Sequence, residues 1–210
     1  MGASGSLPRQ PRSSTRAPTE RRRDAALAGY IGDEATARQA LHDESPEVRI
    51  AALSSLVAMK KVSAEDSALV LADPEDSVRR QACEFGADLT GADFAPLLSD
   101  APNVVEAAAF ALGETGDRTA VPALLRIARE HADALCRESA VAALGALGDE
   151  RAKSVLIDAL NDAPAIRRRA AVALSAFDGD DVIAALEAHL DDRDWQARQA
   201  CEEVLRLLRD

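Results

Sequence analysis

Residues 107–125 read AAAFALGETGDRTAVPALL, and this stretch decides the fold. It starts as an alanine-rich apolar helix, breaks at Gly116-Asp117 and resumes as a second helix with Pro122 near its start. Glycine readily takes the left-handed conformation that ends a helix, and aspartate can cap the helix that follows. The same turn recurs at three other places, Gly32-Asp33, Gly148-Asp149 and Gly179-Asp180. The chain is therefore built from repeated helix–turn–helix segments.

The repeats align on an anchor residue near the start of each first helix. The anchors are Val48, Val78, Val104, Cys136, Ile166 and Ala197, spaced by 30, 26, 32, 30 and 31 residues. Eight residues after the anchor, five of the six repeats carry leucine. Offsets of three, four and eight lie on one face of a helix, and alanines occupy most of the intermediate offsets. A persistent period of about thirty residues predicts a solenoid of stacked helix pairs.

We predict an all-α fold, a right-handed α-α superhelix of about six helix pairs and a closing helix. The thirteen predicted helices cover residues 20–31, 34–42, 46–60, 64–72, 75–88, 93–99, 103–114, 118–130, 134–147, 150–161, 164–177, 180–190 and 194–208. The repeat anchored at Val78 is the shortest and carries Gly86 in place of leucine, so we expect its layer to pack least well. The closing segment, Trp195 to Leu208, has acids and arginines on one side, as a terminal cap facing water requires.

Three strings resemble HEAT repeats of the phycobilisome (PBS) lyase HEAT-like repeat type: SVRRQA at 77–82, AAAFALGETGD at 107–117 and TAVPALL at 119–125. The resemblance extends over roughly residues 20–210 and implies the helical solenoid. It implies little about activity, because such a solenoid is a framework on which unrelated sites are built. The lyases after which the repeat is named attach tetrapyrroles to other proteins.

Charge divides the chain into a basic tail and an acidic body. Residues 1–23 hold six arginines and one acid, and the remainder holds 19 basic and 35 acidic residues, for a net charge of −11. Residues 1–19 are rich in Pro, Ser, Gly and Arg, so we predict a disordered tail there and a HEAT-like repeat domain over residues 20–210. The start also fits the loose N-myristoylation pattern and, lacking acids before Glu20, the composition of a transit peptide. A solvated arm, or a wrongly assigned start, is the simpler interpretation.

The cysteines and the apolar content indicate the compartment. Cys83, Cys136 and Cys201 fall at or near buried offsets of repeats that are not adjacent. Helix layers are about 8–10 Å apart, too far for a disulfide between distant layers. Buried free thiols predict a reducing environment, the cytoplasm. No run of eighteen apolar residues occurs, so we expect no membrane span.

No catalytic, metal or cofactor site is predicted. His42, His131 and His189 lie at the ends of second helices in separate repeats, too far apart to share one metal. Deoxyhypusine hydroxylase, a HEAT-repeat enzyme, builds its di-iron site from His-Glu dipeptides, and this chain has none. The histidines also lie outside the repeats that hold the cysteines, so no thiol has a histidine base. HEAT-like DNA glycosylases use a cationic aromatic groove, whereas this body is acidic with one Trp and one Tyr, so nucleic acid is not an expected partner.

A series of arginines follows the anchors. They are Arg49, Arg79, Arg137, Arg167 and Arg198, and Val105 is the one departure. A positive charge in the first turn of a helix opposes the helix dipole, so each arginine needs a partner. The partners expected are aspartates four or five residues before the anchors, namely Asp43, Asp73, Asp100, Asp162 and Asp192. We predict a structural Asp-Arg ladder between adjacent repeats; the alternative is a row of arginines that binds an acidic partner.

The leading functional hypothesis is a non-catalytic scaffold or adaptor that binds a protein partner on an inner face lined by the second helices. The candidate partner-binding residues are exposed positions on those helices, Arg126, Arg129, Lys153, Asp158 and Glu187. Arg126 and Arg129 also form, with residues 167–169, a candidate basic spot. The alternative is a phycobilin-lyase-like or chaperone-like enzyme acting on a bound chromophore or modified protein, which predicts a deep apolar pocket. A third hypothesis is that the basic arm docks the chain onto nucleic acid or an anionic surface.

Overall fold

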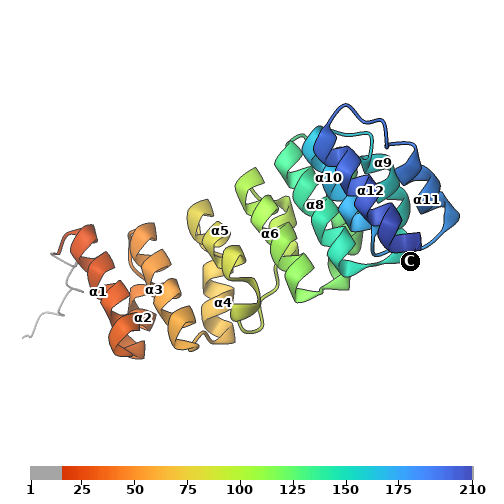
Figure 1. The fold of residues 1–210 in the computed structure, drawn as a ribbon. Coiled ribbons are helices and arrows are strands. Elements are labelled where there is room, and N and C mark those ends of the chain that lie inside the picture. The colour runs from red at the N-terminus through yellow and green to blue at the C-terminus, as the bar shows by residue number, and fades with distance from the viewer. Residues whose placement is uncertain (1–15, 210) are drawn as a thin grey trace, which may run out of the picture. The chain divides into compact units, whose positions relative to one another are not determined.

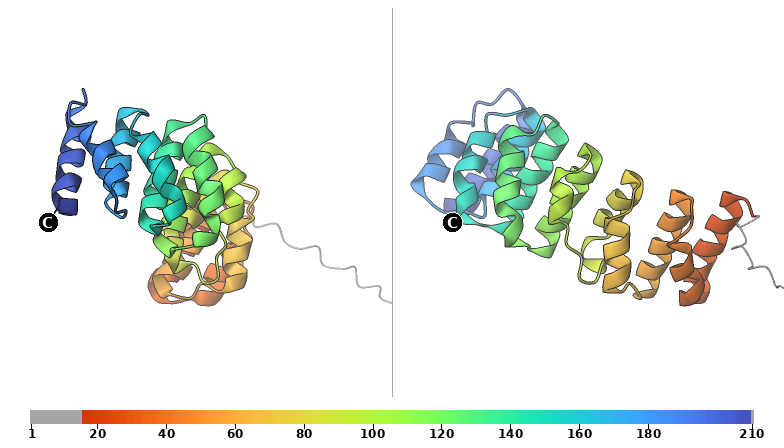
Figure 2. Two further views of the ribbon diagram at one scale, coloured as in Figure 1. Left: turned by 90° about the vertical axis from the view of Figure 1, so that its right-hand side faces the viewer. Right: turned by 180° about the vertical axis from the view of Figure 1, so that it is seen from behind.

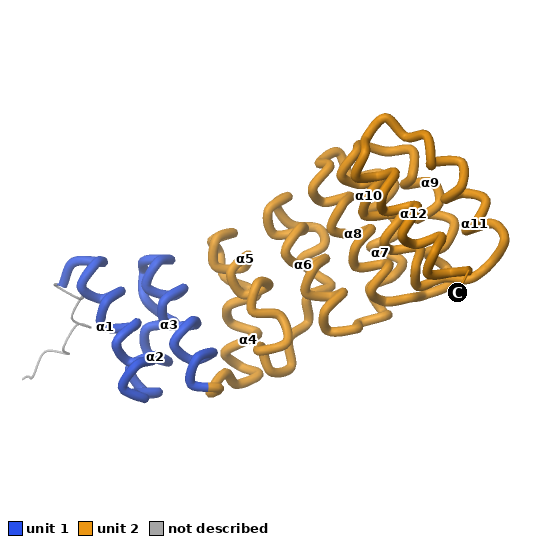
Figure 3. Tube along the Cα trace, viewed as in Figure 1, with its two compact units in different colours: residues 1–59 blue, residues 60–210 orange. Residues whose placement is uncertain are grey.

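A computed structural model describes residues 16–209 (Figure 1). In this range it holds twelve α-helices and four short 3₁₀ helices, and no strand. The chain divides after Met59 into two compact units, the N-terminal unit and the C-terminal unit (Figure 3). Most of the predicted tail lies outside the described residues, and its last two residues, Pro18 and Thr19, already belong to the first helix.

The N-terminal unit consists of α1 (Pro18–Ile31), α2 (Glu34–Ala40) and α3 (Pro46–Met59). Its two longer helices lie in close contact, because a Cβ placed on Gly29 would be only 2.6 Å from the Ser55 Oγ atom. The Ser55 hydroxyl donates a hydrogen bond of 2.8 Å to the Ala25 carbonyl oxygen, so this buried polar group is satisfied across the interface. Gly32 ends α1 with a φ of 77°, as the sequence predicts.

The C-terminal unit holds nine α-helices. They are α4 (Ala64–Leu71), α5 (Asp76–Phe85), α6 (Pro102–Thr115), α7 (Val121–Glu130), α8 (Ala134–Leu147), α9 (Lys153–Ala159), α10 (Pro164–Leu174), α11 (Asp180–Glu187) and α12 (Trp195–Arg209). The 3₁₀ helices are η1 (Gly86–Asp88), η2 (Ala95–Ser99), η3 (Arg118–Ala120) and η4 (Glu150–Ala152). The first helices of the repeats are α1 and α3 in the N-terminal unit and α5, α6, α8, α10 and α12 in the C-terminal unit; the remaining α-helices are the second helices.

Within the C-terminal unit the first helices form one layer and the second helices the other (Figures 1 and 2). The first helices pack tightly because small residues face each other. A Cβ placed on Gly145 would lie 2.5 Å from the Ala173 Cβ, and one on Gly113 would lie 3.0 Å from the Ala143 Cα. The second helices touch one another far less. The close contacts between repeats in this unit are therefore made mainly by the first helices.

The turn chemistry is largely as predicted. Gly116 and Gly148 end α6 and α8 in the left-handed conformation, with φ of 73° and 56°. The following aspartate then accepts a hydrogen bond from a backbone N–H of the next helical turn, 2.9 Å from Thr119 to Asp117. Gly179 differs from the prediction because α10 has already ended at Leu174, and Gly179 instead precedes α11 with an extended ψ of 155°.

The shortest repeat is also the least regular one. The predicted helix over residues 93–99 is the 3₁₀ helix η2, and α5 ends at Phe85 because Gly86 turns the chain with φ of 46°. The 26-residue spacing leaves too little chain for a full second helix, and Pro96 removes one backbone donor. The space is filled by four buried apolar side chains, Leu89, Phe94, Leu97 and Leu98.

All three cysteines are buried and form no disulfide. Burial raises the pKa of the Cys83 thiol to about 12 and those of Cys136 and Cys201 to about 11. None of the helices within residues 16–209 has the length and apolar character needed to cross a bilayer.

Candidate interaction site

Paired arginines and aspartates join successive repeats. Each of these arginines donates through Nε and Nη2 to both oxygens of one carboxylate, a geometry that combines two charge-assisted hydrogen bonds. The pairs are Arg79–Asp100 at 2.6 and 2.6 Å, Arg137–Asp162 at 2.8 and 2.9 Å, and Arg167–Asp192 at 2.7 and 2.7 Å. A fourth pair, Arg21–Asp43 at 2.8 and 3.0 Å, lies in the N-terminal unit and was missed from the sequence. Its signal is an arginine 28 residues before Arg49.

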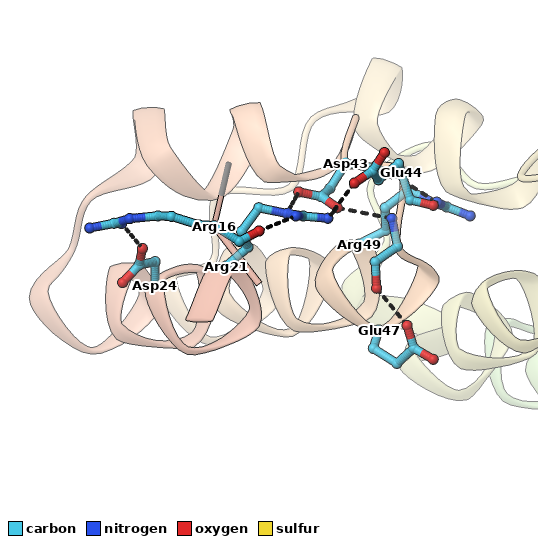
Figure 4. A network of polar contacts seen from close by, with 8 residues as sticks. Arg16, Arg21, Asp24, Asp43, Glu44, Glu47 and Arg49 are labelled. Atoms are coloured by element: carbon cyan, nitrogen blue, oxygen red, sulfur yellow. Dashed lines mark hydrogen bonds and ion pairs between the residues drawn. The ribbon is translucent and has the colours of Figure 1, made fainter. Parts of the chain in front are cut away.

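The ladder arginines also cap the segment before their own helix. Nη1 of each donates to a backbone carbonyl oxygen five or six residues earlier. The bonds run from Arg49 to Asp43, Arg79 to Asp73, Arg137 to His131, Arg167 to Asp162 and Arg198 to Asp192. Figure 4 shows the arrangement around Asp43, where Arg21 approaches from α1 and Arg49 lies beside it. Because these carbonyls are helix-end acceptors, each bond offsets the unfavourable position of the cation in the first turn.

The paired carboxylates are mostly shielded from solvent, with between 7% and 26% of their side-chain surface exposed in the C-terminal unit. Hydrogen bonding to arginine holds the pKa of the Asp100, Asp162 and Asp192 carboxyl groups below their usual value. The same aspartates accept a backbone N–H one or two residues ahead, for example Ala163 to Asp162 at 2.6 Å. The hydrogen-bonding capacity of these carboxylates is therefore used within the fold, where they connect successive repeats.

The five candidate partner-binding residues lie on three second helices, α7, α9 and α11. Lys153 pairs with Glu150 at 3.0 Å and donates to the Asp178 carbonyl oxygen, and Glu187 pairs with Arg209. The other three, Arg126, Arg129 and Asp158, are exposed, and their side chains form no hydrogen bond or ion pair with another residue of the range 16–209. The predicted basic spot is divided as well, because residues 167–169 lie on a first helix and Arg126 and Arg129 on a second helix.

Two hollows lie on the exposed face of the first helices, one in each unit. In the N-terminal unit a cavity of about 800 Å³ lies along α1 and α3, with a floor of small residues that includes Gly29 and Ala51. In the C-terminal unit a cavity of about 400 Å³ lies along α5, α6 and α8, floored by Ala107 and Ser139. An exposed aromatic residue stands at each, Tyr30 with 91% and Phe110 with 58% of its surface accessible.

The two hollows are built from the same positions of the repeat. Their lining comes from one residue before the anchor and from two, three and six residues after it. At these four offsets the N-terminal unit has Glu47, Ile50, Ala51 and Ser54, and the repeat anchored at Val104 has Asn103, Glu106, Ala107 and Phe110. The same kind of hollow therefore recurs at equivalent positions in each unit, and we call it the first-helix groove. The signal available in the sequence is Phe110, a large apolar residue at an outward offset of an alanine-rich helix.

The groove is suited to non-covalent binding. Small side chains let a ligand approach the helix backbones, the aromatics offer apolar area, and charged residues such as Arg80 and Glu106 stand at the edge. Within residues 16–209 no three His, Cys, Asp or Glu side chains gather in a way that would hold a metal ion. The buried cysteines, with their raised pKa values, are thiols and not thiolates at neutral pH.

Comparison with known families agrees with the repeat geometry. A model of HEAT repeats matches residues 92–168, a model of the single HEAT repeat matches residues 37–63, and the PBS lyase HEAT-like repeat matches residues 166–192. The chain is a HEAT-repeat protein. The last of these matches spans α10 and α11 and ends on Asp192, the acceptor of Arg167. A search of curated proteins found no match.

Solved structures resemble this HEAT-repeat protein in fold. YIBA_ECOLI of Escherichia coli is 21% identical, with a TM-score of 0.69 over 88% of this chain and 75% of that one. The complex of CpcE and CpcF of phycocyanin lyase from Nostoc sp. PCC7120 is 18% identical, with a TM-score of 0.52 over 99% and 98% of the chains. Human deoxyhypusine hydroxylase is 23% identical, with a TM-score of 0.48 over 93% and 81%. At these identities the likeness concerns the fold alone.

Proposed function

We propose that this HEAT-repeat protein is a scaffold that binds a protein partner along the first-helix groove. The observation that carries the proposal is the recurrence of one hollow, at equivalent repeat positions, in both compact units. In the C-terminal unit the Asp-Arg pairs and the tightly packed Gly113 and Gly145 stabilise the framework without using the residues that line the groove. The face is thus left available for recognition.

Apolar residues on the first helices supply the binding energy. Phe110 is joined on the first helices of the C-terminal unit by the exposed side chains of Leu135, Val172 and Trp195. Fully burying one large apolar side chain stabilises a complex by about 1.5–3 kcal/mol. Aromatic residues at the centre of a contact surface commonly dominate binding. Phe110 stands among small neighbours inside the groove, so we assign it the role of central contact.

Charge defines the kind of partner. Residues 24–210 are strongly acidic, with 35 acidic against 19 basic residues. At the groove itself Glu84 and Glu106 stand with Arg80, which is held by Glu84. A partner segment that presents apolar side chains together with lysine or arginine complements this surface and is steered toward it.

Site-specific photo-crosslinking in the native cell tests the proposal. A photoreactive phenylalanine analogue is placed at Phe110, and matched controls carry it at Leu69 on α4 and at Asp158 on α9, both exposed second-helix positions. We expect one partner to be crosslinked from position 110 and not from either control position. Crosslinks from position 158 in the absence of any from position 110 would place the partner on the second helices and refute the groove.

Once the partner has been identified, its affinity for variants of this chain provides a quantitative test. Phe110→Ala removes the central aromatic, and Leu207→Ala removes an exposed leucine near the end of α12, away from the groove-lining positions. We expect the dissociation constant to rise at least tenfold for the first variant and to stay unchanged for the second. Equal affinities of the two variants would contradict the proposal.

A further inference from the structure

The Asp-Arg pair is missing from the contact between the repeats of α6 and α8. Both residues of the pair are replaced there. Val105 occupies the position that holds arginine in the other repeats. His131 lies five residues before the anchor Cys136, and the other repeats have aspartate four or five residues before theirs. The join between α6 and α8 therefore lacks the guanidinium and the carboxylate together.

The ladder aspartates have two roles: they pair with an arginine and they accept a hydrogen bond from a backbone N–H. His131 retains only the second role. Its Nδ1 atom accepts a hydrogen bond of 3.1 Å from the backbone N–H of Asp133. The ladder aspartate Asp43 accepts in the same way from Ser45, at 2.9 Å. Because Nδ1 serves as the acceptor, the ring proton of neutral His131 is on Nε2, and the ring does not accept a guanidinium. The turn is preserved while the ion pair is lost.

A surface cavity of about 340 Å³ lies at this join and is lined by both Val105 and His131. Its apolar wall consists of the buried side chains of Val105, Leu98 and Ile127. Asp100, Arg126 and Glu130 provide charged groups at the same cavity. Its volume falls in the range of small-molecule pockets, about 300–1,000 Å³.

The backbone acceptors that an arginine would use are present at this join. In the other repeats Nη1 donates to the carbonyl five or six residues before the arginine, as Arg137 does to His131 at 2.8 Å. Counted from position 105, these carbonyls belong to Asp100 and Ser99, and both residues line the cavity. Neither carbonyl receives a hydrogen bond from any residue in the described part of the chain.

We propose that this cavity binds the side chain of an arginine supplied by a partner protein. The aliphatic stem packs on Val105, Leu98 and Ile127, and the guanidinium donates to the two carbonyls and to the Glu130 carboxylate. Asp100 is already paired through both oxygens with Arg79, so Glu130 is the available anion. Guanidinium fits this set of acceptors better than ammonium because its donors form a planar fork and it is less strongly hydrated.

This inference goes beyond the first-helix groove, since the cavity shares no lining residue with either hollow. The test uses N-acetyl-arginine amide as the probe and N-acetyl-citrulline amide, which has nearly the same shape and no charge, as its control. Methyl NMR signals of Val105 and Ile127 in the full chain report binding. We expect saturable shifts with the arginine compound and an affinity at least tenfold lower with citrulline. Equal affinities, or no saturable shift, would overturn the proposal.

Variants distinguish a bound cation from a bound anion. Val105→Arg places an arginine of the chain itself in the cavity, so it is expected to abolish the probe-induced shifts at Ile127. The control Asn161→Arg adds the same charge on an exposed turn and should leave these shifts intact. The double variant Val105→Arg/His131→Asp rebuilds the complete pair and gives the same test if the single variant folds poorly. Arg126→Ala removes a like charge and should tighten binding several-fold. Weaker binding by Arg126→Ala would indicate an anionic ligand and refute the assignment.

Discussion

Arg137 and Asp162, 25 residues apart in the chain, are joined by two hydrogen bonds of 2.8 and 2.9 Å that connect one repeat to the next. Because both side chains are largely covered, replacing one leaves the other as an uncompensated charge. We expect Arg137→Ala to lower the free energy of unfolding by about 1.5–3 kcal/mol, measured from urea denaturation. Arg129→Ala, at an exposed position, is the control and should change it by less than about 0.5 kcal/mol. Equal effects would show that the pair does not stabilise the fold.

The ladder makes stability fall in acid. Arginine lowers the folded-state pKa of Asp100, Asp162 and Asp192 below the usual 3.8. A lowered folded-state pKa means that the stabilisation is complete above the unfolded-state value and is lost as pH falls through the folded-state value. The urea midpoint should therefore decline below about pH 4. Asp162→Asn should flatten part of that decline, and an unchanged pH profile would contradict the role of this residue.

Close packing of the first helices depends on Gly145. A Cβ there would lie 2.5 Å from the Ala173 Cβ and 2.8 Å from its Cα. Although alanine favours the helix by about 1 kcal/mol over glycine, we expect Gly145→Ala to be destabilising because overpacking typically costs about 1–3 kcal/mol. The double variant Gly145→Ala/Ala173→Gly removes the contact with the Ala173 Cβ but leaves the 2.8 Å approach to its Cα, so it should recover only part of the loss in a urea denaturation experiment. A stabilised single variant would show that the helices move apart freely.

The three thiols should be unreactive in the folded protein. Burial raises the pKa of Cys83 to about 12, and the thiolate is the nucleophile. Titration with a thiol-specific disulfide reagent at pH 8 should detect no rapid reaction in native buffer and all three cysteines in urea. Rapid native reaction of any one of them would show local opening of its repeat.

The sequence predicts the helices and turns well because those features are local. A glycine that must take a positive φ, as at Gly116, and an aspartate that caps the next turn act within a few residues. The helix predicted over 93–99 forms as the 3₁₀ helix Ala95–Ser99 because its type depends on how much chain the 26-residue spacing leaves, a property of two neighbouring repeats. Arg21 was missed because its helix has Glu20, not an apolar anchor, before the arginine.

The candidate site is harder to predict, since one sequence does not tell which face of a helix pair stays open. The polar character of Arg126 and Asp158 favours the second helices. The first-helix groove instead depends on how closely α6 and α8 approach, which glycine and alanine at facing positions determine. Phe110 and Val105 are exceptions to the repeat pattern, and both line cavities in the structure.

The repeat anchored at Ile166 carries a donor for the next repeat, Arg167, and an acceptor for the preceding one, Asp162. A duplicated copy of this repeat inserted after α11 would therefore find a matching partner on both sides. The array can thus lengthen by gene duplication without a new interface. The contact that contains Val105 and His131 lacks the Asp-Arg pair, so the two repeats on either side of it match each other and not the remaining repeats.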